Sequence, residues 1–168
     1  KLNYNICGFI DIQKSDKKIF NLPIMDISHF KNNDSAFVAV GNSQLRKKIV
    51  EEIKNSFVGI EFPNFIDPNS SILDKNSISM GEGNIICANC ILTCDLKIGN
   101  FCQINLSSTI GHDCILGNYI TTASGVHING CNKINDNVYF GTNVATKEKI
   151  YICKNVIIGA GATVIKNI

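Results

Sequence analysis

Large apolar residues recur at every sixth position in the C-terminal part of the chain. Stepping by six from Ile98 to Val164, ten of the twelve positions are large and apolar, and Gly, Asn or Ala follows nine of the twelve. This period fits neither an α-helix nor an alternating strand. It is typical of a parallel β-helix, in which each hexapeptide forms one side of a triangular coil and its apolar residue points into the prism. The register extends back to Met80, while Ile72 and Ile78 keep the six-residue step two residues out of register.

The small residue after each apolar position is expected near a corner of the prism, where Gly and Asn tolerate a positive φ. About five coils fit between residue 72 and the end of the chain. Each coil buries its apolar residues only against the coils above and below it, so the stability of the prism is shared between neighbours.

A different pattern occupies residues 1–65. β-prone apolar runs predict strands at residues 4–10, 36–40 and 57–60. Apolar residues at helical spacing predict an amphipathic helix over residues 43–54, with Ser43 as its N-cap. A strand, a glycine turn and a helix in this order form the unit of a nucleotide-binding sheet. We therefore predict a partial Rossmann-like α/β domain over residues 1–65 and a parallel β-helix domain over residues 66–168.

Charge and hydropathy exclude several classes of protein. The net charge is +2, and no basic stripe favours a nucleic-acid partner. The longest apolar runs are too short to span a bilayer, and no signal-peptide pattern opens the chain. We expect a cytoplasmic protein with no membrane span and no nucleic-acid partner.

The eight cysteines do not form the spacing of a disulfide framework. A cytosolic protein with reduced, mostly buried thiols is the better interpretation. Cys87 and Cys90 have the spacing of half a zinc site, but only Cys94 follows closely and a second pair is missing. We expect these thiols to pack in the core and no metal to be bound.

The segment Ile110-Gly-His-Asp113 places a titratable pair inside the repeat. An imidazole ordinarily titrates at about pH 6.5, so His112 could accept a proton near neutral pH, and Asp113 could orient its ring. From the residues alone, a structural role for His112 is the commoner outcome. Its position predicts a side chain that points inward or lies by a corner. We interpret His29 and His127 as structural.

Five segments resemble the bacterial hexapeptide-repeat sugar acetyltransferases of the sialic-acid O-acetyltransferase and UDP-4-amino-sugar N-acetyltransferase type. They are Gly8-Phe-Ile-Asp11, Ala39-Val-Gly-Asn42 with Arg46-Lys-Lys, Ile66-Asp-Pro-Asn-Ser-Ser71, Ile110-Gly-His-Asp113 and Ile158-Gly-Ala-Gly-Ala162. The resemblance implies a left-handed β-helix, acetyl-CoA as cosubstrate and a UDP-sugar or sialic-acid-type acceptor. It also implies a homotrimer with active sites between subunits, in surface-glycan biosynthesis.

The resemblance further implies roles for residues of the prism. His112 would be the general base and Asp113 its support, and Asn105 would line the acceptor site. Gly130 would offer its backbone N–H to the thioester oxygen. The residues along the pantetheine arm would be Gly141, Ala160 and Gly161. Where the amino-sugar enzymes have a second histidine, nine residues after the first, this chain has Thr121.

The N-terminal region carries candidate nucleotide contacts. Asp11 ends a strand, where carboxylates of nucleotide-binding folds meet the ribose or base. Gly41 and Asn42 open a helix whose N-terminus favours phosphate. Strand-end and turn chemistry account for these three residues equally well without the resemblance, and Arg46 and Lys47 also fit a solvated helix face.

Two other functions fit a hexapeptide prism. A lyase of the γ-carbonic anhydrase type needs three histidines on zinc, and the prism contains only His112 and His127. A non-catalytic trimeric scaffold or sugar-binding module remains an alternative, which the retained pair of His112 and Asp113 disfavours. Acetylation of a sialic-acid-type hydroxyl is the alternative to N-acetylation.

Overall fold

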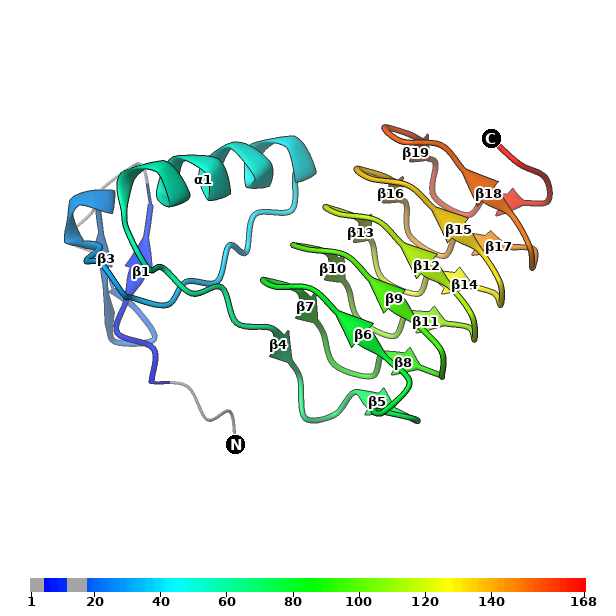
Figure 1. The fold of residues 1–168 in the computed structure, drawn as a ribbon, viewed down its shortest axis with the longest axis horizontal. Helices are drawn as coiled ribbons and strands as arrows, with labels where there is room; N and C mark the ends of the chain where they lie inside the picture. The colour runs from blue at the N-terminus through cyan, green and yellow to red at the C-terminus, as the bar shows by residue number, and fades with distance from the viewer. Residues whose placement is uncertain (1–4, 12–17) are drawn as a thin grey trace.

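The computed structural model describes residues 5–11 and 18–168, most of which form a prism of three parallel sheets (Figure 1). The first sheet has the order β4 (Phe65–Ile66), β7 (Ile85–Ile86), β10 (Gln103–Ile104), β13 (Thr121–Thr122), β16 (Tyr139–Phe140) and β19 (Ile157–Ile158). The second contains β5 (Ser71–Ile72), β8 (Ile91–Leu92), β11 (Thr109–Ile110), β14 (His127–Ile128), β17 (Ala145–Thr146) and β20 (Thr163–Val164). The third contains β6 (Ser79–Met80), β9 (Lys97–Ile98), β12 (Ile115–Leu116), β15 (Lys133–Ile134) and β18 (Tyr151–Ile152). Five complete coils are followed by two strands of a sixth.

The pairing register confirms the predicted hexapeptide repeat. Ile104 lies between Ile86 and Thr122 in neighbouring coils, so one coil takes three hexapeptides. Every apolar position of the repeat from Ile98 to Val164 is the second residue of a two-residue strand and is buried. Between β5 and β6 the chain has two extra residues, which accounts for the change of register found in the sequence.

Two threonines interrupt the apolar positions of the repeat, and the hydroxyl group of each has hydrogen-bond partners inside the prism. The Thr122 hydroxyl accepts from the backbone N–H of Asn105 at 3.0 Å. The Thr146 hydroxyl accepts from the backbone N–H of Asn129 at 3.1 Å and from the side chain of Asn132. A buried hydroxyl is tolerated when it has such partners, so the repeat continues through both positions.

The expectation that the small residue after each apolar position has a positive φ is wrong. Left-handed backbone occurs two residues later, and mostly at residues other than glycine: Asn89, Asp95, Phe101, Ser107, Asp113, Tyr119, Gly125, Cys131, Asn137, Asn143, Lys149, Asn155 and Gly161. Where glycine follows the apolar residue inside the stack, the reason is the close approach of the next coil. A Cβ on Gly111 would lie 2.6 Å from the backbone nitrogen of Gly130.

The N-terminal region contains a small sheet in place of the predicted series of strands. β1 (Phe9–Ile10) pairs in parallel with β3 (Leu22–Met25), which pairs antiparallel with β2 (Lys18–Ile19). A short 3₁₀ helix, η1 (Ile27–His29), follows. The strand predicted over residues 4–10 is confirmed only in its last two residues, and Tyr4 lies outside the described residues.

The strands predicted at residues 36–40 and 57–60 are wrong. Neither segment forms a strand, although an isolated bridge pairs Ser35 with Glu61, the residues next to them in the sequence. The apolar side chains that suggested a strand are buried for another reason, because Ala36 and Val38 belong to a cluster that packs against the prism. The backbone oxygen of Val38 accepts from the Gln103 side chain of β10.

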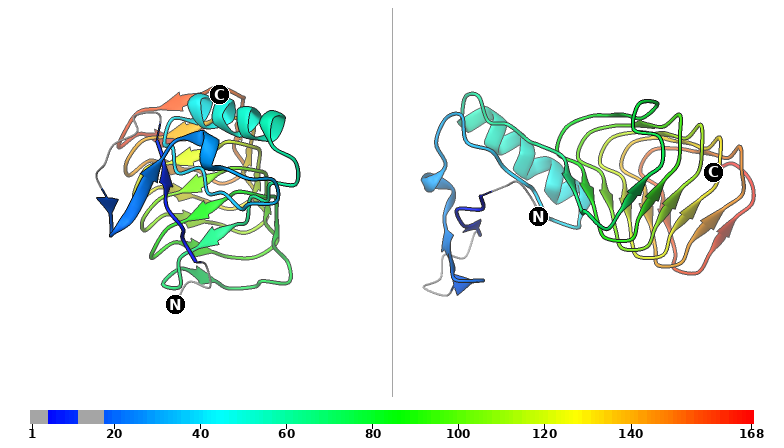
Figure 2. Two further views of the ribbon diagram at one scale, coloured as in Figure 1. Left: turned by 90° about the vertical axis from the view of Figure 1, so that its left-hand side faces the viewer. Right: turned by 90° about the horizontal axis from the view of Figure 1, so that it is seen from below.

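The predicted helix is present as α1 (Ser43–Ser56), with Asn42 and not Ser43 as its N-cap. The Asn42 side chain accepts from the N–H of Leu45 at 2.9 Å. Ser43 instead bonds to Asn137 in the prism. Figures 1 and 2 show α1 and the N-terminal sheet lying to one side of the prism. No helix within the described residues has the length and apolar character needed to cross a membrane.

Arg46 is completely buried between α1 and the prism, so its placement on a solvated helix face is wrong. Its guanidinium donates to the backbone oxygens of Phe101 (2.9 Å) and Val40 (2.7 Å) and to the hydroxyl of Thr121 (2.8 Å). Its neighbour Lys47 remains exposed and lies 3.8 Å from Glu51.

Candidate active site

His112 and Asp113 lie at the prism corner that follows β11. The Nδ1 atom of His112 is 2.7 Å from the Asp113 carboxylate, and both side chains are more than half exposed. Of the two positions predicted for His112, inward or by a corner, the structure selects the corner. Because the carboxylate holds Nδ1, the other ring nitrogen is directed away from Asp113, as a general base requires.

Gly130 lies directly against the His112 ring. A Cβ on Gly130 would be 2.7 Å from Nε2 and 2.8 Å from Cε1 of that ring. Only a residue without a side chain leaves room for the imidazole there. The predicted base, its support and the predicted thioester-oxygen donor therefore come together at one corner, held by two adjacent coils.

A separate hollow of about 530 Å³ lies between the start of α1 and the first sheet of the prism. It is lined by Gly41, Asn42, Ser43, Gln44, Asn105, Thr121, Ala123, Asn137, Tyr139, Asn155 and Ile157. Three of the four predicted acceptor-binding residues thus share one hollow, and none of the described residues that line it is acidic or basic. The fourth, Asp11, lies elsewhere, beside β3, where its N–H donates to the oxygen of Met25.

Several lining residues were missed from the sequence, although a signal for some was present. Asn137 and Asn155 occupy the same position in successive coils, and the amide of Asn137 donates to the side chain of Asn155 at 2.7 Å. Asparagines spaced by one full coil therefore mark a polar column on the surface. The Thr121 hydroxyl accepts a hydrogen bond from Arg46. At the position where the amino-sugar enzymes have a second histidine, this chain therefore has a buried structural contact.

Gly141, Ala160 and Gly161 lie together at the corner that follows the first sheet. A Cβ on Gly141 would be 2.5 Å from the backbone nitrogen of Ala160, and Gly161 has a φ of 72°. Asn105 lies on this corner too, two coils before Gly141. These residues share one corner of the prism, whereas His112 and Gly130 lie on another, so the structure separates Gly130 from the other three residues expected to contact the cosubstrate. One chain alone does not unite the base with the acceptor hollow.

The thiols only partly follow the prediction. All eight cysteines are free, but only Cys90, Cys102 and Cys114 are fully buried, so the expectation of mostly buried thiols is wrong. Of the two cysteines with half-zinc-site spacing, Cys90 lies in the prism core and Cys87 packs against it. The Cys90 thiol donates to the oxygen of Asn105 at 3.1 Å, and burial raises the pKa of the Cys87 and Cys90 thiols.

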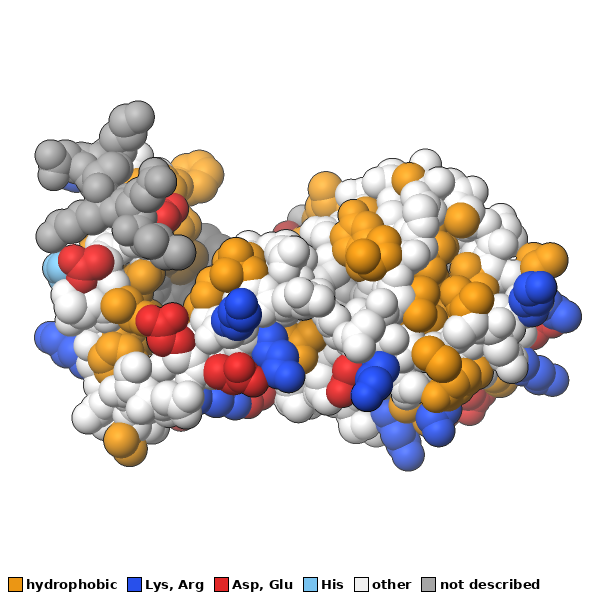
Figure 3. Space-filling model, turned by 90° about the horizontal axis from the view of Figure 1, so that it is seen from above, with side chains coloured by type: hydrophobic (Ala, Val, Ile, Leu, Met, Phe, Trp, Pro, Cys, Tyr) orange, Lys and Arg blue, Asp and Glu red, His pale blue; other side chains and the backbone are white. Residues whose placement is uncertain are grey.

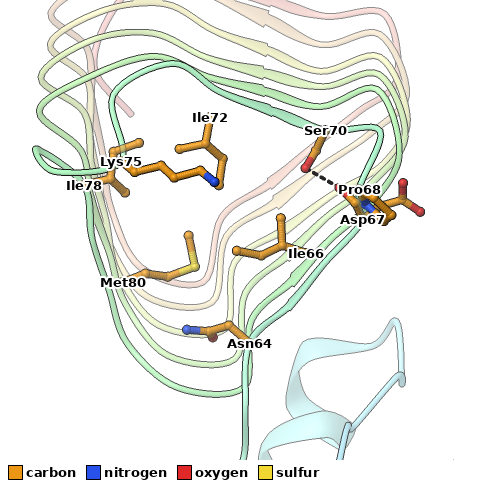
Figure 4. Close-up of a pocket in the computed structure, with 9 residues that line it drawn as sticks. All are labelled: Asn64, Ile66, Asp67, Pro68, Ser70, Ile72, Lys75, Ile78 and Met80. Carbon is orange, nitrogen blue, oxygen red and sulfur yellow. Dashed lines mark hydrogen bonds between the residues drawn. The ribbon is translucent and has the colours of Figure 1, made fainter. Parts of the chain in front are cut away.

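The open first coil forms a second hollow, of about 520 Å³, at the end of the prism (Figure 4). Ile66, Ile72, Ile78 and Met80 line it because no earlier coil covers them, and the Lys75 side chain extends across it. It lies on the first coil, two coils from His112 along the stack. We assign it no part in the chemistry at His112.

Comparison with known proteins identifies the family. The PglD N-terminal domain model matches residues 1–53. WeeI from Acinetobacter baumannii AYE is 32% identical, with a TM-score of 0.86 over 96% of this chain and 78% of that one. The GDP-perosamine N-acetyltransferase of Escherichia coli O157:H7 is 35% identical over 74% of this chain and 54% of its own length. The chain belongs to the hexapeptide-repeat sugar acetyltransferases.

The fold is the left-handed parallel β-helix of this family, preceded by a short N-terminal domain. The acetyltransferase domain of PglB from Neisseria gonorrhoeae FA1090, solved with acetyl coenzyme A, shares the fold with a TM-score of 0.87 at 22% identity, over 96% of this chain and 78% of that one. The chain spans about half the length of the curated E. coli relative that it matches.

Proposed function

We propose that this protein is an acetyl-CoA-dependent N-acetyltransferase that acts on a nucleotide-linked amino sugar. The observation that carries the proposal is the exposed pair of His112 and Asp113, set against Gly130 at a corner of the prism. The curated relative acts on a nucleotide-linked amino sugar, GDP-perosamine, which favours an amine over the hydroxyl of a sialic-acid-type acceptor. We place the reaction in the cytoplasm, in the synthesis of bacterial surface glycans.

In the proposed reaction His112 acts as the general base. The neutral amine of the sugar attacks the thioester carbonyl of acetyl-CoA, and Nε2 of His112 takes the proton that the amine loses. The backbone N–H of Gly130 stabilises the oxyanion, and Asp113 stabilises the imidazolium. The tetrahedral intermediate collapses with cleavage of the carbon–sulfur bond, and the imidazolium returns the proton to the leaving thiolate. The products are the N-acetyl sugar and CoA.

We propose that the active unit is a homotrimer. The base lies on one corner of the prism, whereas the acceptor hollow lies over the first sheet and the small residues for the pantetheine arm lie on the corner that follows that sheet. A neighbouring subunit that sets one corner against the other would complete the site. Large apolar residues that such contacts would cover are exposed on the prism, among them Ile91, Ile115 and Tyr151, and Figure 3 shows hydrophobic side chains gathered over the prism.

For the nucleotide we propose the N-terminal region. The start of α1 at Gly41 and Asn42 would face the diphosphate, and Asp11 would contact the ribose or base. Among the described residues no cationic side chain lines the hollow, and the backbone N–H groups at the start of α1 would carry the phosphate contact. Sequence patterns favour a UDP-sugar, whereas the curated relative favours a GDP-sugar. Both kinds of nucleotide sugar therefore belong in the first assay.

The test is acetyl transfer from acetyl-CoA to a panel of UDP- and GDP-linked amino sugars and sialic acids. Replacing a general base lowers kcat by about 10²–10⁴-fold, and we expect this for His112→Ala. His127→Ala is the matched control, because His127 is an exposed prism histidine whose side chain hydrogen-bonds to Thr109, away from the proposed base. Equal turnover by His112→Ala would overturn the assignment of the base. Absence of turnover with every acceptor would favour a scaffold, and turnover with sialic acid alone an O-acetyltransferase.

A further inference from the structure

Cys131 completes a group of three potential metal ligands at the corner that carries the proposed base. The ligand atoms of His112, Asp113 and Cys131 all lie within 4.8 Å of one another. Among the described residues, no other group of three His, Cys, Asp or Glu side chains meets this condition. The proposed transfer reaction uses two of the three residues and leaves the thiol without a role.

The stacking of the coils brings the three side chains together. Asp113 and Cys131 occupy the same corner position in successive coils, with φ of 58° and 60°. Parallel backbones in such a stack run about 4.8 Å apart, so equal conformations direct the two side chains the same way. The N–H of Cys131 donates to the oxygen of His112 at 2.8 Å, which fixes the spacing of the two coils at this point.

The donor atoms are those of a zinc site. A thiolate, an imidazole and a carboxylate are all ligands of Zn²⁺, whereas Mg²⁺ and Ca²⁺ take oxygen ligands. Around a tetrahedral Zn²⁺ the ligand atoms lie about 3.3–3.8 Å apart, which small side-chain rotations would reach here. The fourth position would hold water, because all three side chains are at least partly exposed.

We propose that His112, Asp113 and Cys131 bind Zn²⁺ and that the bound ion inhibits the transferase. The inhibition rests on the proposed function, whereas the metal site does not. A neutral imidazole that ligates Zn²⁺ through one ring nitrogen carries its proton on the other, so a His112 that ligates Zn²⁺ has no free lone pair with which to act as a base. The ion would also separate Asp113 from the ring that it orients.

Metal binding can be tested without any sugar, using Co²⁺ as the probe in the absence of added thiols. We expect a near-ultraviolet thiolate-to-cobalt band in the wild type, displaced by Zn²⁺ and absent in Cys131→Ser. Cys153→Ser is the matched control, because Cys153 is an exposed thiol on a different corner of the prism. It should retain the band. A wild type without the band, or a Cys131→Ser variant that keeps it, overturns the site.

The inhibition is measured by adding Zn²⁺ during turnover and separating the acetylated sugar by chromatography, since thiol reagents would remove the ion. Cys131→Ser should match the wild type without metal and need at least about tenfold more Zn²⁺ for half-inhibition. EDTA should restore wild-type turnover, and Mg²⁺ should not inhibit. Equal Zn²⁺ sensitivity of both proteins contradicts the inhibitory role. A cobalt band in a protein with no turnover on any acceptor contradicts the proposed function and supports the metal site.

Discussion

The prism and the N-terminal region are stabilised in different ways. The prism has a continuous core of its own, in which each inward residue packs on its equivalents one coil away. Among the described residues the N-terminal region has a small cluster of six buried side chains, and one of them, Phe101, belongs to the prism. The first region gains its stability from repetition, whereas the second depends on a surface that the first provides.

Aromatic rings join the two regions. The ring of Phe62 meets that of Phe101 edge-on at 5.2 Å, and Phe101 stacks on Tyr119 at 5.4 Å. Lys54 of α1 lies over the Phe101 ring and pairs with Glu82 of the prism. We therefore expect the prism to fold without the N-terminal region, but not the reverse.

The largest effect should come from removing a ring in the prism core. Phe140→Ala deletes a completely buried side chain from β16, which should cost about 3–5 kcal/mol in the free energy of unfolding. Urea unfolding followed by circular dichroism measures this loss. Tyr139→Ala is the control, because the Tyr139 side chain, next to Phe140 in β16, points outward and is partly exposed. An equal loss in the free energy of unfolding in the two variants would contradict the conclusion that the inward residues of the repeat stabilise the prism.

Arg46 tests the dependence of the N-terminal region on the prism. Arg46→Met keeps much of the side-chain volume but leaves buried carbonyl oxygens without their donor. This should cost roughly 2–3 kcal/mol, confined to the N-terminal region. Hydrogen exchange should show faster opening of α1, with unchanged protection in the prism. Lys47→Met, on the exposed face of α1, should leave both regions unchanged, and equal opening throughout the chain would show that the two regions are not separable.

The two regions also differ in how well the sequence predicts them. The prism can be predicted from short stretches of sequence, because one residue in six enters the core and the pattern repeats along the chain. The burial of Arg46 has no local signal, since its acceptors include Phe101 and Thr121, far along the sequence. The same is true of residues 36–40, whose apolar pattern fits a strand as well as the extended segment that packs on the prism.

The candidate site shows the same division. His112 and Asp113 adjoin in sequence, and their pairing was predictable. Gly130 meets the His112 ring, and Cys131 lies beside both, because one coil contains three hexapeptides. Finding these neighbours in the sequence requires counting three hexapeptides forward from His112. The separation of His112 from the acceptor hollow required the assignment of each residue to a corner of the prism.

The glycines after the apolar positions offer a smaller test of the prism. Gly141→Ala would place a Cβ 2.5 Å from the Ala160 nitrogen, and the strain should cost about 1–2 kcal/mol. Gly159 occupies the same position one coil later, where nothing lies within 4 Å of an added Cβ. Gly159→Ala should therefore be neutral or slightly stabilising. Equal melting temperatures for the two variants would show that close approach of the coils does not explain these glycines.

The smallest effect concerns thiol reactivity. Labelling the thiols compares the interior of the prism with the exposed surface and needs no substitution that would change the stability of the protein. Burial raises the pKa of Cys102 to about 12 and that of Cys114 to about 11, so both remain thiols at neutral pH. Because only the thiolate reacts, an alkylating reagent should spare both in the folded protein and label them after unfolding. Cys7 and Cys153 are exposed and should be labelled without unfolding. Mass spectrometry of the labelled peptides distinguishes these classes, and early labelling of Cys102 would show that the prism opens more readily than its packing implies.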